Sequence, residues 1–392
     1  MVKITELKGI KILPSLPFEI IINKGKESLQ CLELQRWLPG KRLVFYSNLK
    51  GREILIKIFI DPSSSKRHWK RELKGIKFLL DLKISTPALI DYFFENGIGV
   101  IICERINPAN TLYQVWNNLS DHEKRKHRQL ALELLADMHN KGIWQKDMHL
   151  GNILVSNKKY YCIDCDTIKV EKLGEPLSRK KSIKNLGLFF AQFSPGNDIF
   201  IKNDLNCYFD KRRERFYIEK FYKLVTKSTI KSRKYRIDKY LKKIFRECSE
   251  FKVCSTPDKY QIIRKDSINN DLLDMLNNPV KFINEANILR SDNISTSAKI
   301  NLSGSFYFVK LFFTKNTIIS FWKNAYLLKL LGVNIVLPLA FVRYTKGKSN
   351  IRACVISRFY EGLHLNTFIE NNKKEQIIRQ LKGVFTNFRY AY

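Results

Sequence analysis

The feature that most constrains this chain is a short polar loop at residues 145–152, with the sequence QKDMHLGN. It places Asp147 and Asn152 five positions apart, between an expected helix and a short expected strand. The next expected strand, over 160–164, ends on Asp164. Carboxylate and amide oxygens are the ligands that a hard cation such as Mg²⁺ prefers. The pattern therefore favours a fold that brings the two loops together.

A lysine and a glutamate upstream extend the pattern. Lys57 lies inside the apolar run over 53–60, which predicts a β-strand. A buried ammonium is costly without a partner, and Glu72, on an expected helix over 66–82, can supply one. Taken alone, Lys57 is more simply an edge-strand lysine that points to water. The order of strand Lys, helix Glu, loop Asp and Asn, and strand-end Asp is nevertheless that of a protein-kinase catalytic centre.

In such a centre each residue has a chemical task. Lys57 and Glu72 would form a clamp for nucleotide phosphate, and Asp147 would accept the proton of the attacking hydroxyl. Asn152 and Asp164 would bind magnesium from adjacent loops. The sequence therefore predicts an ATP- and Mg²⁺-dependent phosphotransferase with an alcohol group as acceptor.

The flanking segments resemble the bacterial lipopolysaccharide core kinases, the Kdo/heptose kinase family of protein-kinase-like fold. The segments that carry the resemblance are LPGKRLVFYSNLKG (38–51), HWKRELKGIKFL (68–79), KDMHLGNILV (146–155), YYCIDCDTIKV (160–170) and NLGLFFAQF (185–193). The match covers roughly residues 30 to 210. It implies phosphorylation of sugar hydroxyls of the lipopolysaccharide inner core and the same residue roles as above.

The chain departs from the usual kinase pattern at three places. Gln145 stands where a mainly structural His is usual, two residues before Asp147, and the usual DFG is Asp164-Cys165-Asp166. No GxGxxG is present, so Gly40 is the residue that could bring backbone amides near phosphate, although a plain hairpin turn explains it equally well. Asp166 could be a further metal or hydrogen-bonding group.

The histidines need no catalytic role in this interpretation. His149, beside the catalytic Asp, is more simply structural. A helix C-terminal dipole suffices to explain His139. Cys162 and Cys165 form a lone CxxC, which favours two strand thiols over a zinc site because a second such pair is missing.

The net charge of the chain limits the kinds of molecule that it is expected to bind. The 392 residues include 70 Lys and Arg against 37 Asp and Glu, a formal net charge of +33. Such a surface attracts polyanions. The basic, aromatic stretch 211–246 could bind nucleic acid, but given the kinase interpretation we expect it to face lipopolysaccharide, another anionic glycolipid or an anionic membrane. Nucleic acid is disfavoured. Without a visible secretory signal or membrane-spanning run, we expect a cytoplasmic protein, with a peripheral position on the inner membrane as an option.

Part of the sequence pattern around Lys57 occurs a second time in the last third of the chain. SFYFVKLFF, with Lys310, resembles EILIKIF, with Lys57, and each is followed by a helix with Trp-Lys. We predict an α+β fold: a two-lobed, protein-kinase-like domain over 1–254, then an incomplete second kinase-like N-lobe over 280–392. The N-lobe would cover about 25–105 and the C-lobe about 106–254, and a polar linker would cover 255–279.

The second copy lacks the parts for transfer. Ala325 stands at the position of Glu72, and neither HxD nor DxxxxN follows Lys310. Residues from about 280 onward would be a pseudokinase-like binding or stabilising module, or the remnant of a tandem enzyme. For the first copy, the residues leave three alternatives to a sugar kinase. The acceptor could be a protein Ser, Thr or Tyr, or a small aminoglycoside-like molecule, or the domain could be a catalytically inactive scaffold.

Overall fold

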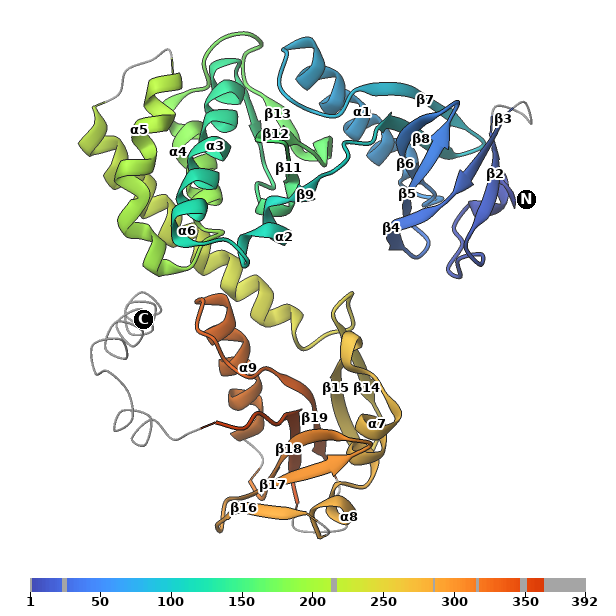
Figure 1. Ribbon diagram of the computed structural model, residues 1–392, viewed down its shortest axis with the longest axis vertical. Coiled ribbons are helices and arrows are strands. Elements are labelled where there is room, and N and C mark those ends of the chain that lie inside the picture. The colour runs from blue at the N-terminus through green and yellow to red at the C-terminus, as the bar shows by residue number, and fades with distance from the viewer. Residues whose placement is uncertain are drawn as a thin grey trace. The chain divides into compact units, whose positions relative to one another are not determined.

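The structure of the chain is a computed structural model, which describes residues 2–22, 27–212, 217–284, 286–314, 317–345 and 351–362. It mixes helices and sheets, as expected, and divides into two compact units (Figure 1). The first unit comprises residues 1–192 and 199–230, and the second comprises 193–198 and 231–392.

The N-terminal half of the first unit contains two sheets. Its strands are β1 (Val2–Lys3), β2 (Phe18–Ile22), β3 (Glu27–Cys31), β4 (Glu33–Leu38), β5 (Arg42–Leu49), β6 (Arg52–Phe59), β7 (Leu89–Glu95) and β8 (Ile98–Glu104). One sheet has the order β1-β2-β3 and the other β4-β5-β6-β8-β7. The 3-10 helix η1 (Ile4–Leu7) follows β1, and helix α1 (Ser65–Asp81) connects β6 to β7. The strand predicted over 53–60 and the helix predicted over 66–82 are confirmed.

The sheet β1-β2-β3 was not predicted. Its strands are short, and Lys and Glu interrupt their apolar residues, so the alternation that identifies a strand is weak. Burial reveals their role, because they share one hydrophobic core with the larger sheet. The core includes Leu7, Ile20, Leu29, Phe45, Ile56, Val100 and Ile102, each at most 1% exposed.

The rest of the first unit is mainly helical. Its helices are α2 (Leu112–Trp116), α3 (Asp121–Asn140), α4 (Arg179–Phe190), η5 (Pro195–Phe200), α5 (Ile201–Lys211) and α6 (Ile218–Lys243), of which η5 and α6 extend into the second unit. Helix α3 begins with a capping box, in which Ser120 and Glu123 satisfy each other's backbone amides. A buried ion pair of 2.7 Å between Arg128 and Asp204 ties α3 to α5.

Short strands and turns between α2 and α4 carry the predicted loops. They are β9 (Asn110–Thr111), β10 (Ile143–Gln145), η3 (Leu150–Asn152), β11 (Ile153–Ser156), β12 (Lys159–Cys162), η4 (Cys165–Thr167) and β13 (Ile168–Val170). Strands β12, β11 and β9 form one small sheet, and β10 pairs with β13. The hairpin of β11 and β12 places Asn152, before β11, beside Ile163, after β12.

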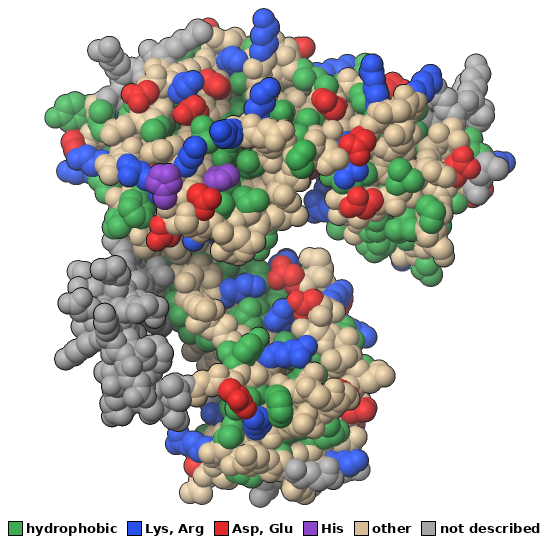
Figure 2. Space-filling model, in the orientation of Figure 1, with side chains coloured by type: hydrophobic (Ala, Val, Ile, Leu, Met, Phe, Trp, Pro, Cys, Tyr) green, Lys and Arg blue, Asp and Glu red, His purple; other side chains and the backbone are tan. Residues whose placement is uncertain are grey.

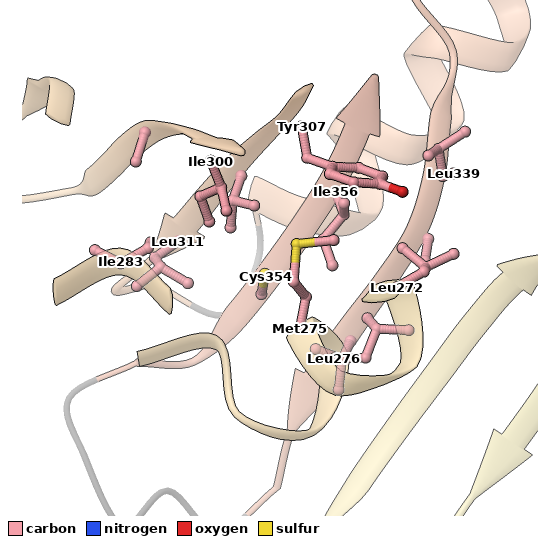
Figure 3. Packing of buried hydrophobic residues seen from close by; sticks show 14 of the residues in the cluster. Leu272, Met275, Leu276, Ile283, Ile300, Tyr307, Leu311, Leu339, Cys354 and Ile356 are labelled. Carbon is pink, nitrogen blue, oxygen red and sulfur yellow. The ribbon is translucent and has the colours of Figure 1, made fainter. Parts of the chain in front are cut away.

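The second unit is built on one seven-stranded sheet. Its elements are β14 (Phe251–Ser255), β15 (Lys259–Arg264), η6 (Lys265–Ser267), α7 (Asn270–Asn277), α8 (Pro279–Asn284), β16 (Asn287–Ser291), β17 (Ser295–Leu302), β18 (Ser305–Phe312), α9 (Thr317–Leu330), β19 (Pro338–Tyr344) and β20 (Ala353–Arg358). The strand order is β14-β15-β19-β20-β18-β17-β16. Figure 3 shows Leu272 and Met275 of α7 packed beside Cys354 and Ile356 of β20.

The expected polar linker over 255–279 is wrong in the form stated. Strand β15 pairs with β14 on one side and with β19 on the other, and α7 buries Leu272, Met275 and Leu276 in the core of the second unit. The Asn- and Asp-rich composition of this segment hid these few apolar positions. The boundaries of the two predicted domains, 1–254 and 280–392, remain predictions.

The two units share a strand order. Strands β16-β17-β18-β20-β19 follow one another in space as β4-β5-β6-β8-β7 do, and a helix, α9 or α1, connects the third and fourth strands along the chain in each. The hairpins also agree in register. Lys57 lies five residues after Arg52, which pairs with Leu49, and Lys310 lies five residues after Ser305, which pairs with Leu302.

Charged side chains are spread over the visible face of both units (Figure 2). In the described residues, no helix is long and apolar enough to cross a membrane. The eight cysteines carry free thiols of differing burial, and Cys162 and Cys165 are both buried.

Candidate phosphotransfer site

Lys57 and Glu72 form an ion pair beneath the sheet. Lys57 lies on the central strand β6, paired with Val44 of β5 and Ile101 of β8. Its ammonium donates to Oε1 of Glu72 on α1. The Lys57 side chain is 13% exposed and that of Glu72 is completely buried. The structure thus brings together the two residues predicted as a clamp.

The lysine of this pair is charged. Burial lowers the pKa of Lys57, but the carboxylates of Glu72 and Asp164 and the hydrogen bond to Glu72 outweigh it, so the pKa is raised above its ordinary value. Removing either member of such a pair would leave an uncompensated buried charge, which commonly costs about 3–5 kcal/mol. The pair therefore fixes α1 against the sheet.

Asp164 lies next to this pair. It follows β12 in the left-handed backbone region, with φ 58° and ψ 63°, a conformation that Asp tolerates better than most residues. Its Oδ1 lies 3.9 Å from Nζ of Lys57 and 3.5 Å from Nη1 of Arg42, and its Oδ2 lies 3.9 Å from Nη1 of Arg36. Burial raises the pKa of Asp164, but Lys57, Arg42, Arg36 and His149 lower it further, so the carboxylate is ionised at neutral pH.

Asp147 and Asn152 belong to one tightly bonded loop. Nδ2 of Asn152 donates to the backbone carbonyl of Asp147 over 2.9 Å, and the backbone amide of Asp147 donates to Oγ1 of Thr167 over 3.4 Å. The Ile163 amide donates to the Asn152 carbonyl, which links the loop to the Asp164 strand. Asn152 is buried and Asp147 is exposed. The Asp147 carboxylate is therefore accessible to an acceptor, as a base must be.

Gln145 has a role that sequence reasoning missed. Its completely buried side chain donates to the carbonyls of Ile163 and Asp164, over 3.0 and 3.1 Å. Its own carbonyl accepts from Nδ2 of Asn185 over 2.7 Å. Gln145 thus ties the Asp147 loop to the Asp164 turn. Its place two residues before Asp147, where a structural His is usual, was the signal available.

The helix-dipole explanation of His139 is wrong. His139 is completely buried, and its ring nitrogens contact the Tyr208 hydroxyl at 2.8 Å and Oδ1 of Asn185 at 2.9 Å. Burial lowers the pKa of His139 to about 3. A neutral imidazole gains little from a helix dipole. His139 instead supports Asn185, which in turn holds Gln145.

Helix α1 touches the turn that follows Asp164. A Cβ on Gly75 would lie 2.0 Å from the carbonyl oxygen of Cys165, so only glycine fits there. On the same helix, Nε and Nη2 of Arg71 donate to the carbonyl of Asp166, over 3.2 and 3.1 Å. The Glu72 helix and the Asp164 turn are therefore positioned by direct contact.

The carboxylates of this region suit a divalent cation. Glu72, Asp164 and Asp166 each offer an oxygen within 4.8 Å of the others. Oε2 of Glu72 is buried and has no hydrogen-bond partner among the described residues. Asn152 uses its Nδ2 for the loop, so a metal ion at this residue would bind its Oδ1. These hard oxygen donors fit Mg²⁺. Burial, Glu72 and Asp164 raise the pKa of Asp166, so Asp166 is less readily ionised than Asp164.

Gly40 is placed differently from the other predicted residues. It has a φ of 69° in the turn between β4 and β5, and its amide donates to the carbonyl of Ile10 over 2.6 Å. That amide is satisfied within the protein. The proposed contact of Gly40 with nucleotide phosphate stays a prediction, and the hairpin-turn interpretation accounts for its conformation.

The matching positions of the second unit are chemically different. Lys310 lies on β18 between Ser297 and Val355, as Lys57 lies between Val44 and Ile101. Ala325 is 4% exposed and follows Trp322 by three residues, as Glu72 follows Trp69. No carboxylate of the described residues forms an ion pair with Lys310.

Comparisons with known proteins add little. No protein-family model and no curated protein match the sequence. One similar solved structure, titled "WaaP in complex with acyl carrier protein", is 18% identical, with 52% of this chain and 88% of that chain covered and a TM-score of 0.38. A TM-score this low establishes neither fold nor function, so both depend on the geometry above.

Proposed function

We propose that the first unit is an ATP-dependent kinase that phosphorylates a sugar hydroxyl, of Kdo or heptose, in the lipopolysaccharide inner core. The observation that carries the proposal is the buried Lys57–Glu72 pair with Asp164 at 3.9 Å from the same ammonium. Phosphoryl transfer is catalysed mainly by positioning and by electrostatic stabilisation. A charged lysine beside an ionised aspartate supplies both for a metal-bound triphosphate.

Each residue then has a step to perform. Lys57 holds phosphate oxygens, and Glu72 holds Lys57 in place. Asp164 and Asn152 would hold Mg²⁺, which neutralises charge on the transferred phosphoryl group. Asp147 orients the acceptor hydroxyl and accepts its proton. Gln145 keeps the Asp147 loop and the Asp164 turn in register through its two hydrogen bonds.

An anionic acceptor is favoured by charge. The net charge of +33 attracts phosphorylated or carboxylated glycolipids and anionic membrane surfaces. The start of helix α6 exposes Lys220, Lys223 and Lys227 next to Tyr217, 77% exposed, and Leu224, 38% exposed. Cations beside apolar side chains suit the interface of an anionic membrane better than nucleic acid. We therefore propose a peripheral position on the cytoplasmic side of the inner membrane.

The test is phosphate transfer by the full chain. Purified protein, labelled ATP and Mg²⁺ are incubated with dephosphorylated lipopolysaccharide core, with a generic protein acceptor and with an aminoglycoside in parallel. We expect label on the core, and a loss of about 10²- to 10⁴-fold in kcat for Asp147→Ala. Asp137→Ala, an exposed aspartate of α3, is the matched control and should transfer normally.

Each other outcome changes the proposal. Transfer to protein or aminoglycoside alone would replace the acceptor class. ATP binding without any transfer would favour the inactive scaffold. Normal transfer by Asp147→Ala would remove Asp147 as the base. For residues 280–392, the buried Ala325 in place of Glu72 supports a binding or stabilising module without transfer activity of its own.

A further inference from the structure

The hairpin turn between β4 and β5 offers no backbone amide to a ligand. In a kinase of the proposed type, this hairpin would cover the nucleotide phosphates, and glycine-loop amides commonly hold them. Here Pro39 has no amide hydrogen. The amides of Gly40 and Lys41 donate to the carbonyls of Ile10 and Leu38, over 2.6 and 2.9 Å. Other donors must therefore replace the glycine-loop amides.

Two arginines on the same hairpin reach the Asp164 carboxylate. Arg42 begins β5 and pairs with Leu38, and Arg36 lies on β4 opposite Val44. Their Nη1 atoms lie 3.5 Å from Oδ1 and 3.9 Å from Oδ2 of Asp164. The Arg42 side chain is only 15% exposed and stacks over the Phe59 ring at 5.9 Å, whereas that of Arg36 is 52% exposed.

The charges around Asp164 leave a cationic surplus. Lys57, Arg42 and Arg36 contribute three positive charges, and Glu72 and Asp164 contribute two negative ones, a net of +1 (3 − 2). Asp166 is next to a cation of its own, Arg71. A metal ion on Asp164 would add positive charge, and a triphosphate is the anion that would balance it.

We infer that Arg42 and Arg36 bind the phosphate oxygens of the nucleotide, in place of glycine-loop amides. The inference depends on the proposed kinase function. A guanidinium suits this task because its planar donors match phosphate oxygens in pairs. Asp164 holds the two arginines as the structure shows them. With a metal ion on that carboxylate, they would turn from it to the phosphate oxygens of the nucleotide. Arg42 contributes more to phosphate binding than Arg36 does, because its side chain is the more buried and the more firmly held.

The test compares ligands that differ only in phosphate number. Dissociation constants of adenosine, ADP and ATP are measured by calorimetry with Mg²⁺, for the full chain and for Arg42→Ala and Arg36→Ala. For Arg42→Ala we expect unchanged adenosine binding, weaker ADP binding and a loss of about tenfold or more for ATP, since a charge-assisted hydrogen bond contributes about 1.5–3 kcal/mol. Arg36→Ala should also weaken ATP binding most and adenosine binding least, but with smaller losses of affinity than Arg42→Ala.

Two further variants make the result specific. Arg52→Ala, at the exposed arginine that begins β6 near the opposite end of β5, is the matched control and should bind all three ligands normally. Arg42→Lys keeps the charge without the paired donors and should recover part of the ATP affinity. It also replaces Arg42→Ala if that variant does not fold, which circular dichroism shows.

The outcomes separate this inference from the proposed function. If the wild-type chain binds neither ADP nor ATP with Mg²⁺, the kinase proposal itself fails. If it binds ATP and both arginine variants behave like Arg52→Ala, only the arginine inference is overturned. An equal loss for adenosine and ATP would also overturn it, because the arginines would then support the fold rather than the phosphates.

Discussion

The two units place a lysine at the same point of the same strand order, but of these two lysines only Lys57 forms ion pairs with carboxylates of the described residues. Lys57 contacts Glu72 and lies 3.9 Å from Asp164. At Lys310 the helix offers Ala325, and no carboxylate of the described residues pairs with the ammonium. The strand lysine is thus a property that both sheets share. The helix residue three positions after the tryptophan decides whether the lysine becomes part of a charged site.

The helices differ at a second matching position. Gly75 follows Trp69 by six residues and lets α1 lie against the Cys165 carbonyl. Leu328 follows Trp322 by the same six residues in α9, and it is only partly buried. Helix α9 therefore has no glycine at the position where α1 meets the Cys165 carbonyl.

The largest difference between the units should appear when each lysine is removed in turn. Lys57→Met should lower kcat by about 10²-fold or more, because a positioned charge is lost from the transferring phosphate. It should also destabilise the first unit by about 3–5 kcal/mol, because Glu72 is left buried and unpaired. Transfer assays measure the first effect, and hydrogen exchange of α1 measures the second.

Lys310→Met is the matched control. Because Lys310 has no buried carboxylate to leave behind among the described residues, its loss should change stability by about 0.5 kcal/mol or less. Transfer should be normal. Equal effects of the two substitutions would show that the units use their lysines alike, against the comparison.

The next largest effect should come from Gly75→Ala. Alanine normally stabilises a helix by about 1 kcal/mol relative to glycine. Here its Cβ would lie 2.0 Å from the Cys165 carbonyl oxygen, so we expect a net loss of about 1–3 kcal/mol. The helix must move away from the Asp164 turn, and transfer should fall with it. Faster hydrogen exchange in both α1 and η4 is the measurement.

Leu328→Ala tests the same position of the second unit. It removes partly buried methyl groups, so we expect a loss of about 1 kcal/mol without any effect on transfer. If Gly75→Ala instead stabilises the protein, the backbone contact seen at Cys165 is not a constraint on α1.

A third difference concerns pH, since the buried histidine His139 belongs to the first unit. Its folded pKa of about 3 lies below the ordinary 6.5. Between these values the unfolded chain binds a proton that the folded chain does not, so stability is complete above pH 6.5 and falls as the pH decreases toward 3. The loss from about pH 7 to about pH 5 should be about 2 kcal/mol.

Comparison with His139→Gln isolates this effect. Glutamine keeps hydrogen-bonding atoms but does not titrate, so the variant should lose about 2 kcal/mol less over the same pH interval than the wild type. Urea unfolding followed by tryptophan fluorescence is suitable, because four of the five tryptophans lie in the first unit. Parallel pH dependences would mean that His139 is not held neutral.

The sequence predicted those parts of the site that depend on local order. The strand Lys57 and the helix Glu72 each have a local pattern, and the structure shows both. Long-range contacts were not predictable in this way. The place of Gln145 two residues before Asp147 indicates a structural role, but not that it bonds to carbonyls eighteen and nineteen residues later. No local pattern indicates that His139 is buried against Tyr208.

The N-terminal sheet could not be predicted for the same reason, because it depends on long-range contacts. Strands β1, β2 and β3 become regular only because they bury Ile20 and Leu29 against the five-stranded sheet, which no local pattern records. The segment 255–279 was misjudged for the converse reason. Its many Asn and Asp residues mark turns and helix caps, such as Asn269 before α7, rather than a linker.

The smallest expected effect comes from introducing a carboxylate on α9 where α1 has Glu72. Ala325→Glu places a carboxylate at the position of Glu72 on a helix that buries this site to 4% exposure. A buried carboxylate without a partner is costly, so the single substitution should destabilise the second unit. Lys310 can offset part of that cost only if the sheet and α9 have the geometry of β6 and α1. Thermal unfolding of Ala325→Glu, Lys310→Met and the double variant measures this as a coupling free energy.

We expect Ala325→Glu to lower the free energy of unfolding less when Lys310 is present than when Lys310 is replaced by Met. The difference should be about 1 kcal/mol, a usual coupling for residues in contact. A positive result would mean that the second unit keeps the geometry of the clamp and has lost only its carboxylate. Zero coupling would limit the likeness of the two units to strand order. Either way, transfer by the first unit should not change, because Ala325 and Lys310 take no part in it.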